Sequence, residues 1–233
     1  MIGRAEQFET PRPPGVVQGE LSDHRERRRR RGGRMIREAE LFVTAEQVAV
    51  WVLGRVGREH RSTTVPPPFG LPDGTPVPIS SVIREHARDD ATVPDLLAGG
   101  EPGTEDPLAG GDNDREAVLT RLAEESVAAA SKAADPEAIV HSRHGDVTVA
   151  DYLLRQTVLR AVTAHEVAVF SGSVCPLTEV FARTMWEITE PRADHWRAVG
   201  LFGPALTPVP SDVSWRDRFL MSAGRDPHPL WDR

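Results

Sequence analysis

Apolar residues recur at intervals of three and four residues in five long segments of the chain, and this spacing is that of one face of an α-helix. In the first segment, Leu41, Val48 and Val52 lie on one such face. No segment shows a convincing alternation of apolar and polar residues, which a half-buried strand would require. The chain is therefore expected to be all-α. The expected helices span residues 36–59, 79–97, 113–134, 147–171 and 176–198.

Proline and glycine separate the helical segments. Residues 65–78 are rich in proline and glycine, and residues 99–112 contain two glycine pairs, so both are expected to be long connections. Pro94 and Pro191 fall inside expected helices, where proline kinks or ends a helix. Long connections allow crossovers between helices. We therefore expect a four-helix bundle with an additional C-terminal helix, followed by an irregular arm over residues 201–233 that packs on the bundle.

Length and composition fit a single globular domain. The chain has 233 residues, of which 39% are hydrophobic and 27% are charged. It contains no run of about 18 apolar residues and no apolar N-terminal segment, so neither a transmembrane helix nor a signal peptide is expected. The single cysteine, Cys175, excludes an internal disulfide and a zinc–thiolate cluster. These features favour a cytoplasmic protein without a membrane partner.

Arginine is concentrated at the N-terminus. Residues 1–34 hold nine arginines against five acidic residues, whereas the whole chain has a formal charge of −7. The rest of the chain is therefore strongly acidic, which argues against nucleic acid as its partner. Prolines and the run Arg27–Arg31 predict a disordered leader over residues 1–34, ahead of a helical domain over residues 35–200. The leader is either a tail for nucleic acid or an anionic surface, or an extension ahead of a start at Met35. We favour the second, because the amphipathic pattern begins directly after Met35.

Two histidines continue apolar helical faces, which directs them toward the interior of the bundle. His86 follows Ile83 on a face of the second helix, and Asp90 lies one turn further along that face. His165 follows Ala161 on a face of the fourth helix. Bundles build metal sites from side chains on facing helices, and imidazole is a common ligand of zinc, iron and nickel. We therefore predict that His86 and His165 converge across the interface of the second and fourth helices, with Asp90 as third ligand.

The same residues admit an interpretation without a metal. Both histidines are then core residues whose ring nitrogens form hydrogen bonds, because burial penalises unpaired polar groups. Asp90 would in that case orient His86 rather than bind an ion. Glu166 follows His165 directly, but adjacent helical residues diverge by about 100°, so the two share one ion less easily. The sequence contains no nucleophile elbow, P-loop or dinucleotide-binding glycine pattern that would indicate another catalytic site.

Five segments of the chain resemble a known family. They are ISSVIREHARDDATVPDLLAG (79–99), GDVTVADYLL (145–154), TAHEVA (163–168), DHWRAVGLFGP (194–204) and GRDP (224–227). The segments resemble actinobacterial DinB-like proteins related to mycothiol-dependent maleylpyruvate isomerase. Together they extend over most of residues 35–227.

The resemblance implies a helical bundle that binds a divalent metal, zinc or nickel, through three side chains. One is a histidine on the second helix, which His86 matches. The others are a histidine, which His165 matches, and a glutamate or histidine one turn before it. That earlier position is Ala161, which cannot bind a metal. Either Asp90 or Glu166 then replaces the third ligand, or the metal site has been lost.

The activity implied by the resemblance is Lewis-acid activation of a thiol, here mycothiol, toward a small electrophile. The protein would then be a thiol-dependent isomerase or transferase, with a small-molecule thiol and an electrophile as partners. The competing hypothesis is a non-catalytic bundle that has lost its metal site and binds a small molecule or forms a homodimer. The metal content of the purified protein separates the two hypotheses.

Overall fold

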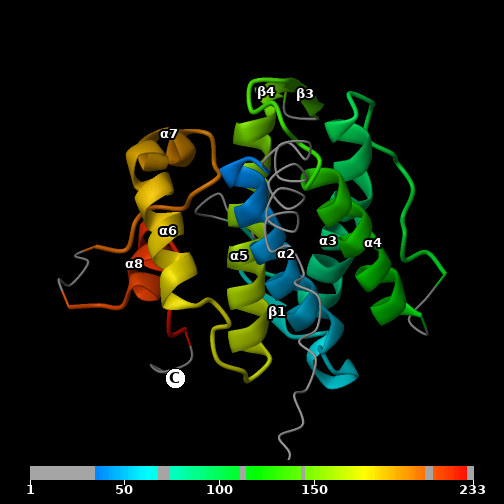
Figure 1. The fold of residues 1–233 in the computed structure, drawn as a ribbon. Coiled ribbons are helices and arrows are strands. Elements are labelled where there is room, and N and C mark those ends of the chain that lie inside the picture. The colour runs from blue at the N-terminus through cyan, green and yellow to red at the C-terminus, as the bar shows by residue number, and fades with distance from the viewer. Residues whose placement is uncertain (1–34, 68–73, 111–113, 143–144, 208–211, 230–233) are drawn as a thin grey trace, which may run out of the picture. The chain divides into compact units, whose positions relative to one another are not determined.

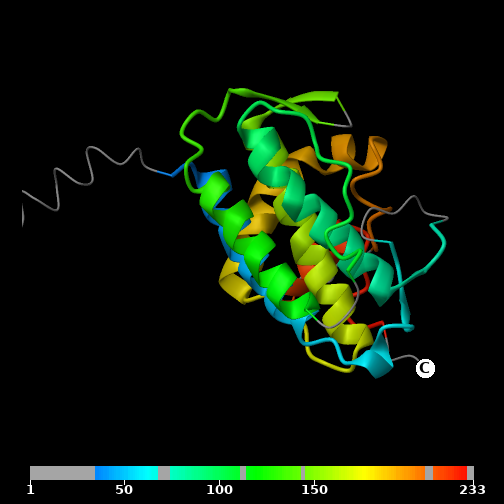
Figure 2. The ribbon, with the colours of Figure 1, turned by 90° about the vertical axis from the view of Figure 1, so that its right-hand side faces the viewer.

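Four long helices dominate the part of the chain that the structure describes (Figure 1). The computed structural model describes residues 35–67, 74–110, 114–142, 145–207 and 212–229. The four helices are α2 (Arg37–Gly54), α3 (Ile79–Leu97), α4 (Arg115–Ala130) and α5 (Val149–Phe170). Helices α2 and α3 each contact both α4 and α5, and the second view shows α3 and α4 side by side (Figure 2). The protein is therefore mostly helical, as the apolar spacing predicted.

Helix α5 is buried on nearly all sides. Of its 22 residues, 16 are buried, and it contributes to each of three clusters of buried apolar side chains. Leu153 and Leu154, although adjacent in sequence, belong to different clusters. A polar side chain on this helix is consequently enclosed whichever way it points, and needs a partner on a neighbouring element.

The first helix ends earlier than expected, whereas the second helix has the expected bounds. The first helix ends at Gly54 rather than at residue 59, and the 3₁₀ turn η1 (Arg58–His60) follows it. Helix α3 spans the expected residues and continues through Pro94 to Leu97, so this proline does not end the helix. Because Pro94 lies in the last turn, its ring removes a single backbone hydrogen bond near a helix end, where the cost is smallest.

The expected helix over residues 176–198 is divided at Pro191. Two helices and a 3₁₀ turn replace it, namely α6 (Glu179–Thr189), η2 (Glu190–Arg192) and α7 (Ala193–Ala198). Proline in η2 has no N–H to continue the α-helical ladder, so the chain tightens there before the next helix begins.

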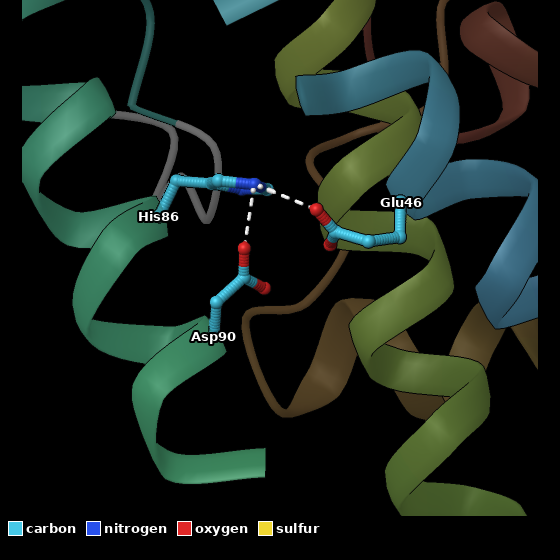
Figure 3. Close-up of side chains that lie close together, drawn as sticks. All are labelled: Glu46, His86 and Asp90. Atoms are coloured by element: carbon cyan, nitrogen blue, oxygen red, sulfur yellow. Dashed lines mark hydrogen bonds and ion pairs between the residues drawn. The ribbon is translucent and has the colours of Figure 1, made fainter. Parts of the chain in front are cut away.

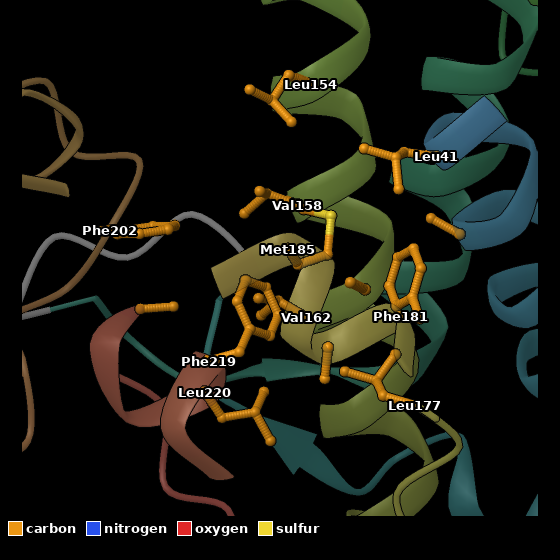
Figure 4. Close-up of a cluster of buried hydrophobic side chains, with 14 of the residues drawn as sticks. Leu41, Leu154, Val158, Val162, Leu177, Phe181, Met185, Phe202, Phe219 and Leu220 are labelled. Atoms are coloured by element: carbon orange, nitrogen blue, oxygen red, sulfur yellow. The ribbon is translucent and has the colours of Figure 1, made fainter. Parts of the chain in front are cut away.

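A further helix lies where an irregular arm was expected. Helix α8 (Trp215–Ser222) contacts α6, and its Phe219 and Leu220 pack in one cluster with buried side chains of α5 and α6 (Figure 4). The expectation of a wholly irregular arm over residues 201–233 is therefore wrong for this segment. Eight residues are too few to display a repeated helical stripe, so the apolar spacing did not reveal the helix.

Two short antiparallel strand pairs lead into helices, although no strand was expected from the sequence. β1 (Thr64–Val65) pairs with β2 (Val77–Pro78), and β3 (Ile139–Ser142) pairs with β4 (Gly145–Thr148). Strands of two to four residues are too short to show alternation, which is why the pattern missed them. β2 ends where α3 begins and β4 ends where α5 begins, so the strand pairs fix the starts of both helices.

The junction between β4 and α5 is capped by Thr148, whose hydroxyl accepts a hydrogen bond from the backbone N–H of Asp151 at 3.1 Å. Thr148→Ala is expected to lower the free energy of unfolding by about 1 kcal/mol, because a helix N-cap residue loses its bond. Denaturant unfolding of wild type and variant measures the difference. Thr120→Ala, at an exposed position of α4, is the control, and equal losses in the two variants would contradict the capping role.

The described residues all belong to one compact unit of the chain. The expected disordered leader, residues 1–34, lies outside them. Among the helices of this unit that the structure describes, none combines the length and the apolar character needed to cross a bilayer.

Candidate metal centre

Three buried side chains from two helices converge on one point (Figure 3). Glu46 comes from α2, and His86 and Asp90 come from α3. The Nε2 atom of His86 lies 3.3 Å from Oε1 of Glu46 and 3.2 Å from Oδ2 of Asp90. The three candidate ligand atoms all lie within 4.8 Å of one another, which makes them the candidate site of this protein.

The local sequence explains why these side chains face inward. His86 and Asp90 are four residues apart in α3, so they lie one above the other on the same helical face. Glu46 lies on α2 between Phe42 and Ala49, both of which are completely buried. Burial of its neighbours on that face carries the carboxylate into the interior, where it must find charged or hydrogen-bonding partners.

Arg160 of α5 lies against the same two carboxylates. Its Nε donates a hydrogen bond to Oε2 of Glu46, and its Nη2 donates to Oδ1 of Asp90. Its Nη1 donates to the side-chain oxygen of Gln156 and, at 3.3 Å, to the backbone carbonyl of the same residue. Each carboxylate thus gives one oxygen to Arg160 and directs the other toward His86.

The four charged groups are nearly sealed from solvent, which strengthens their interactions. Glu46 and Arg160 are 0% exposed, Asp90 is 1% exposed and His86 is 4% exposed. Burial alone would lower the pKa of His86, but Asp90 and Glu46 outweigh it and raise the pKa to about 10. Burial would raise the pKa of Glu46, but His86 and Arg160 hold it well below its ordinary value. Without an ion, His86 is therefore protonated at neutral pH and the two cations balance the two carboxylates.

The donor set and its spacing fit a divalent ion. One imidazole nitrogen and two carboxylate oxygens are ligands that zinc accepts, and bonds of about 2.0–2.1 Å in a tetrahedron place neighbouring ligand atoms about 3.3 Å apart. The two separations from His86 Nε2, 3.2 and 3.3 Å, agree with that value. In addition, Oδ2 of Asp90 is buried, and its contact with Nε2 of His86, at 3.2 Å, is poorly directed for a hydrogen bond. An ion at this point would satisfy it.

A cavity of about 590 Å³ opens beside α3. Its wall includes the buried side chains of His86, Asp89 and Thr163, and the apolar side chains of Val82 and Leu159. Of the three candidate ligands, only His86 lines this cavity. His86 is therefore the member of the candidate centre that a molecule in this cavity would contact.

His165 is not part of the candidate centre. Its Nε2 donates a hydrogen bond to the backbone carbonyl of Asp226 at 3.0 Å, in the segment after α8. The expected convergence of His86 and His165 is therefore replaced by one in which Glu46 takes part. The reason lies in helix geometry: five residues after Arg160, the direction of the side chain on α5 has turned by about 140°.

Glu166 does not take the third ligand position either. Its Oε1 lies 3.6 Å from Nη1 of Arg225, in the same C-terminal segment that receives His165. Burial raises the pKa of Glu166 to about 7, against the attraction of Arg225. Burial also lowers the pKa of His165 to about 4, so both side chains tend to be uncharged inside the protein.

Sequence reasoning missed Glu46 and Arg160. Each is a charged residue at a position where the helical spacing of buried neighbours continues: Glu46 between Phe42 and Ala49, and Arg160 within the almost wholly buried α5. A charged residue inside an apolar face requires a buried partner of opposite charge. That signal was present in the sequence, although it does not say which partner.

No family model matches this chain, and comparison with curated proteins and with solved structures finds no match either. The resemblance to DinB-like and mycothiol-dependent proteins therefore remains an expectation drawn from the quoted segments. The evidence for the candidate centre is its geometry, in which a glutamate of α2 and a histidine and an aspartate of α3 form one buried group.

Proposed function

We propose that this protein binds one divalent metal ion through Glu46, His86 and Asp90. The observation that carries the proposal is the convergence of three buried ligand atoms, one imidazole nitrogen and two carboxylate oxygens, within 4.8 Å of one another. A mixed nitrogen and oxygen donor set suits zinc or nickel, whereas calcium and magnesium prefer sites made of oxygen alone. We also propose that α2 to α5 form a DinB-like four-helix bundle, which their mutual contacts support.

For catalysis we propose a thiol-dependent isomerase or transferase that acts on a small electrophile in the cavity beside α3. When bound, the metal would supply Lewis-acid activation of a thiol such as mycothiol. His86 both lines the cavity and belongs to the candidate centre, so it would connect a bound ion to the cavity. The apolar side chains of Val82 and Leu159 line the same cavity and would exclude water from it.

One observation favours the alternative of a non-catalytic bundle. Arg160 and protonated His86 already balance the charges of Glu46 and Asp90, so the four residues can form a closed ion network without a metal. In some proteins, buried ionic groups of this kind specify a single arrangement of the core. The protein would then bind a small molecule in its cavity, or form a homodimer, without metal chemistry.

Metal analysis of the full-length chain separates these two functions. After loading with zinc or nickel and removal of free ion, we expect one metal ion per wild-type chain and none in His86→Ala, because that variant lacks the only nitrogen ligand. Asp90→Ala is expected to bind metal more weakly. A wild-type protein that retains no metal under these conditions would overturn the metal proposal and favour the closed ion network.

Two histidine variants serve as controls. His141→Ala removes an exposed imidazole that pairs with Asp146 at 2.8 Å, and it should keep the wild-type metal content. His165→Asn should also keep its metal, because His165 bonds to the C-terminal segment rather than to the candidate centre. Loss of metal from His165→Asn, in a variant with native circular dichroism, would support the ligand set expected from the family resemblance.

A further inference from the structure

Arg160 divides the carboxylate oxygens of the candidate centre into two sets. It bonds Oε2 of Glu46 and Oδ1 of Asp90, whereas Oε1 and Oδ2 face His86. The guanidinium is itself fixed by Gln156, and it lies 4.6 Å from the ring centroid of Phe42. Arg160 is completely buried, and so are its hydrogen bonds to Glu46 and Asp90.

The geometry of a guanidinium determines what this arrangement can do. Its N–H groups point in fixed directions in one plane and hold two carboxylates in set orientations, which a lysine ammonium cannot do. With one oxygen of each carboxylate bound to Arg160, Glu46 and Asp90 can each offer only one oxygen to an ion. A carboxylate that is free to rotate can instead offer both oxygens, as calcium sites use.

We propose that Arg160 is a positioning residue that limits Glu46 and Asp90 to one metal-binding oxygen each and thereby selects a small ion of low coordination number. The inference rests on the proposed function, since it concerns the same ion. It assigns a role to a residue that contacts no ion itself. The consequence is that zinc and cobalt, which accept four ligands, are preferred over calcium, which requires more oxygen ligands.

The charge of Arg160 and its orientation of the carboxylates have opposite effects on the affinity of the centre for a divalent ion. A positive charge beside the centre repels any divalent ion, so charge alone predicts that removing it tightens binding. Orientation predicts weaker zinc binding, because residues that hold metal ligands in place typically contribute about 10- to 100-fold in affinity. Arg160→Lys keeps the charge and loses the planar fork, so it isolates the effect of orientation.

Cobalt substitution provides a readout that does not depend on activity. Tetrahedral Co²⁺ absorbs visible light much more strongly than octahedral Co²⁺, so the band reports the number of ligands. We expect Arg160→Lys to lose about 10- to 100-fold in zinc affinity and most of its visible cobalt absorption per bound ion. Arg121→Lys makes the same chemical change in an exposed pair with Glu125 and should leave both quantities unchanged.

The outcomes distinguish the inference from the proposed function. If wild type binds Co²⁺ and Arg160→Lys shows the same band and zinc affinity, Arg160 does not position the ligands, although the metal site stands. If wild type binds neither ion, the proposed function itself is wrong. Should Arg160→Lys fail to fold by circular dichroism, Gln156→Leu removes a support of Arg160 while leaving the guanidinium in place. A weaker cobalt band in Gln156→Leu than in wild type then supports the inference, and an unchanged band overturns it.

Discussion

Glu46→Ala is expected to lower the free energy of unfolding of the metal-free protein by about 3–5 kcal/mol, the usual cost of removing one partner from a buried charge network. Glu46 is 0% exposed and contacts both His86 and Arg160. Its removal leaves two buried cations with Asp90 as their remaining carboxylate in the cluster. For a chain of this size, the midpoint of thermal unfolding should fall by roughly 6–20 °C.

Denaturant unfolding of the metal-free proteins measures this effect. Glu125→Ala is the matched control, because Glu125 forms an exposed pair with Arg121, and such pairs contribute about 0–1 kcal/mol. A loss in Glu46→Ala that is no larger than that in Glu125→Ala would mean that Glu46 does not pair with Arg160 in the folded protein.

The helical class of the fold could be predicted because it depends on local spacing. The apolar positions of residues 79–97 repeat with the period of a helix, and α3 has those same bounds. The strands and α8 could not be predicted in this way. β1 has two residues and α8 has eight, and both are stabilised by pairing or packing with distant parts of the chain rather than by a local pattern.

The candidate site could be predicted only where it lies within one helix. His86 and Asp90 are four residues apart in α3, so their proximity follows from helix geometry alone. Glu46 and Arg160 reach them from α2 and α5, and the relative rotation and height of three helices are not encoded in any single segment. His165 illustrates the limit: because α5 is buried nearly all round, its apolar spacing does not show which face meets α3 and which meets the C-terminal segment.

Glu166→Gln is expected to make the protein more stable relative to wild type at pH 8 than at pH 5. Glu166 is 3% exposed, and burial raises its pKa from 4.5 to about 7, although Nη1 of Arg225 lies 3.6 Å away. A raised pKa means that the folded protein holds this proton more tightly than the unfolded chain does. The stabilising contribution is therefore complete below pH 4.5 and is lost as the pH rises through about 7.

The size of the effect follows from the shift. At about 1.4 kcal/mol per pKa unit, the free-energy difference between variant and wild type should change by roughly 3 kcal/mol across this range. Glutamine stays neutral at every pH, so the variant does not lose this contribution. Thermal or denaturant unfolding of both proteins at pH 5, 6, 7 and 8 measures the change. Glu125→Gln, which alters an exposed carboxylate, is the control and should follow wild type.

His165 also affects how the free energy of unfolding of Glu166→Gln depends on pH. Burial lowers its pKa from 6.5 to about 4, so its contribution is present above pH 6.5 and is lost as the pH falls toward 4. In wild type the opposite trends of His165 and Glu166 largely cancel between about pH 4.5 and 6.5. Glu166→Gln removes one of them, so the variant should gain stability as the pH rises through this window. Parallel profiles for wild type and Glu166→Gln would show that Glu166 is already ionised in the folded protein, with the attraction of Arg225 outweighing the cost of burial.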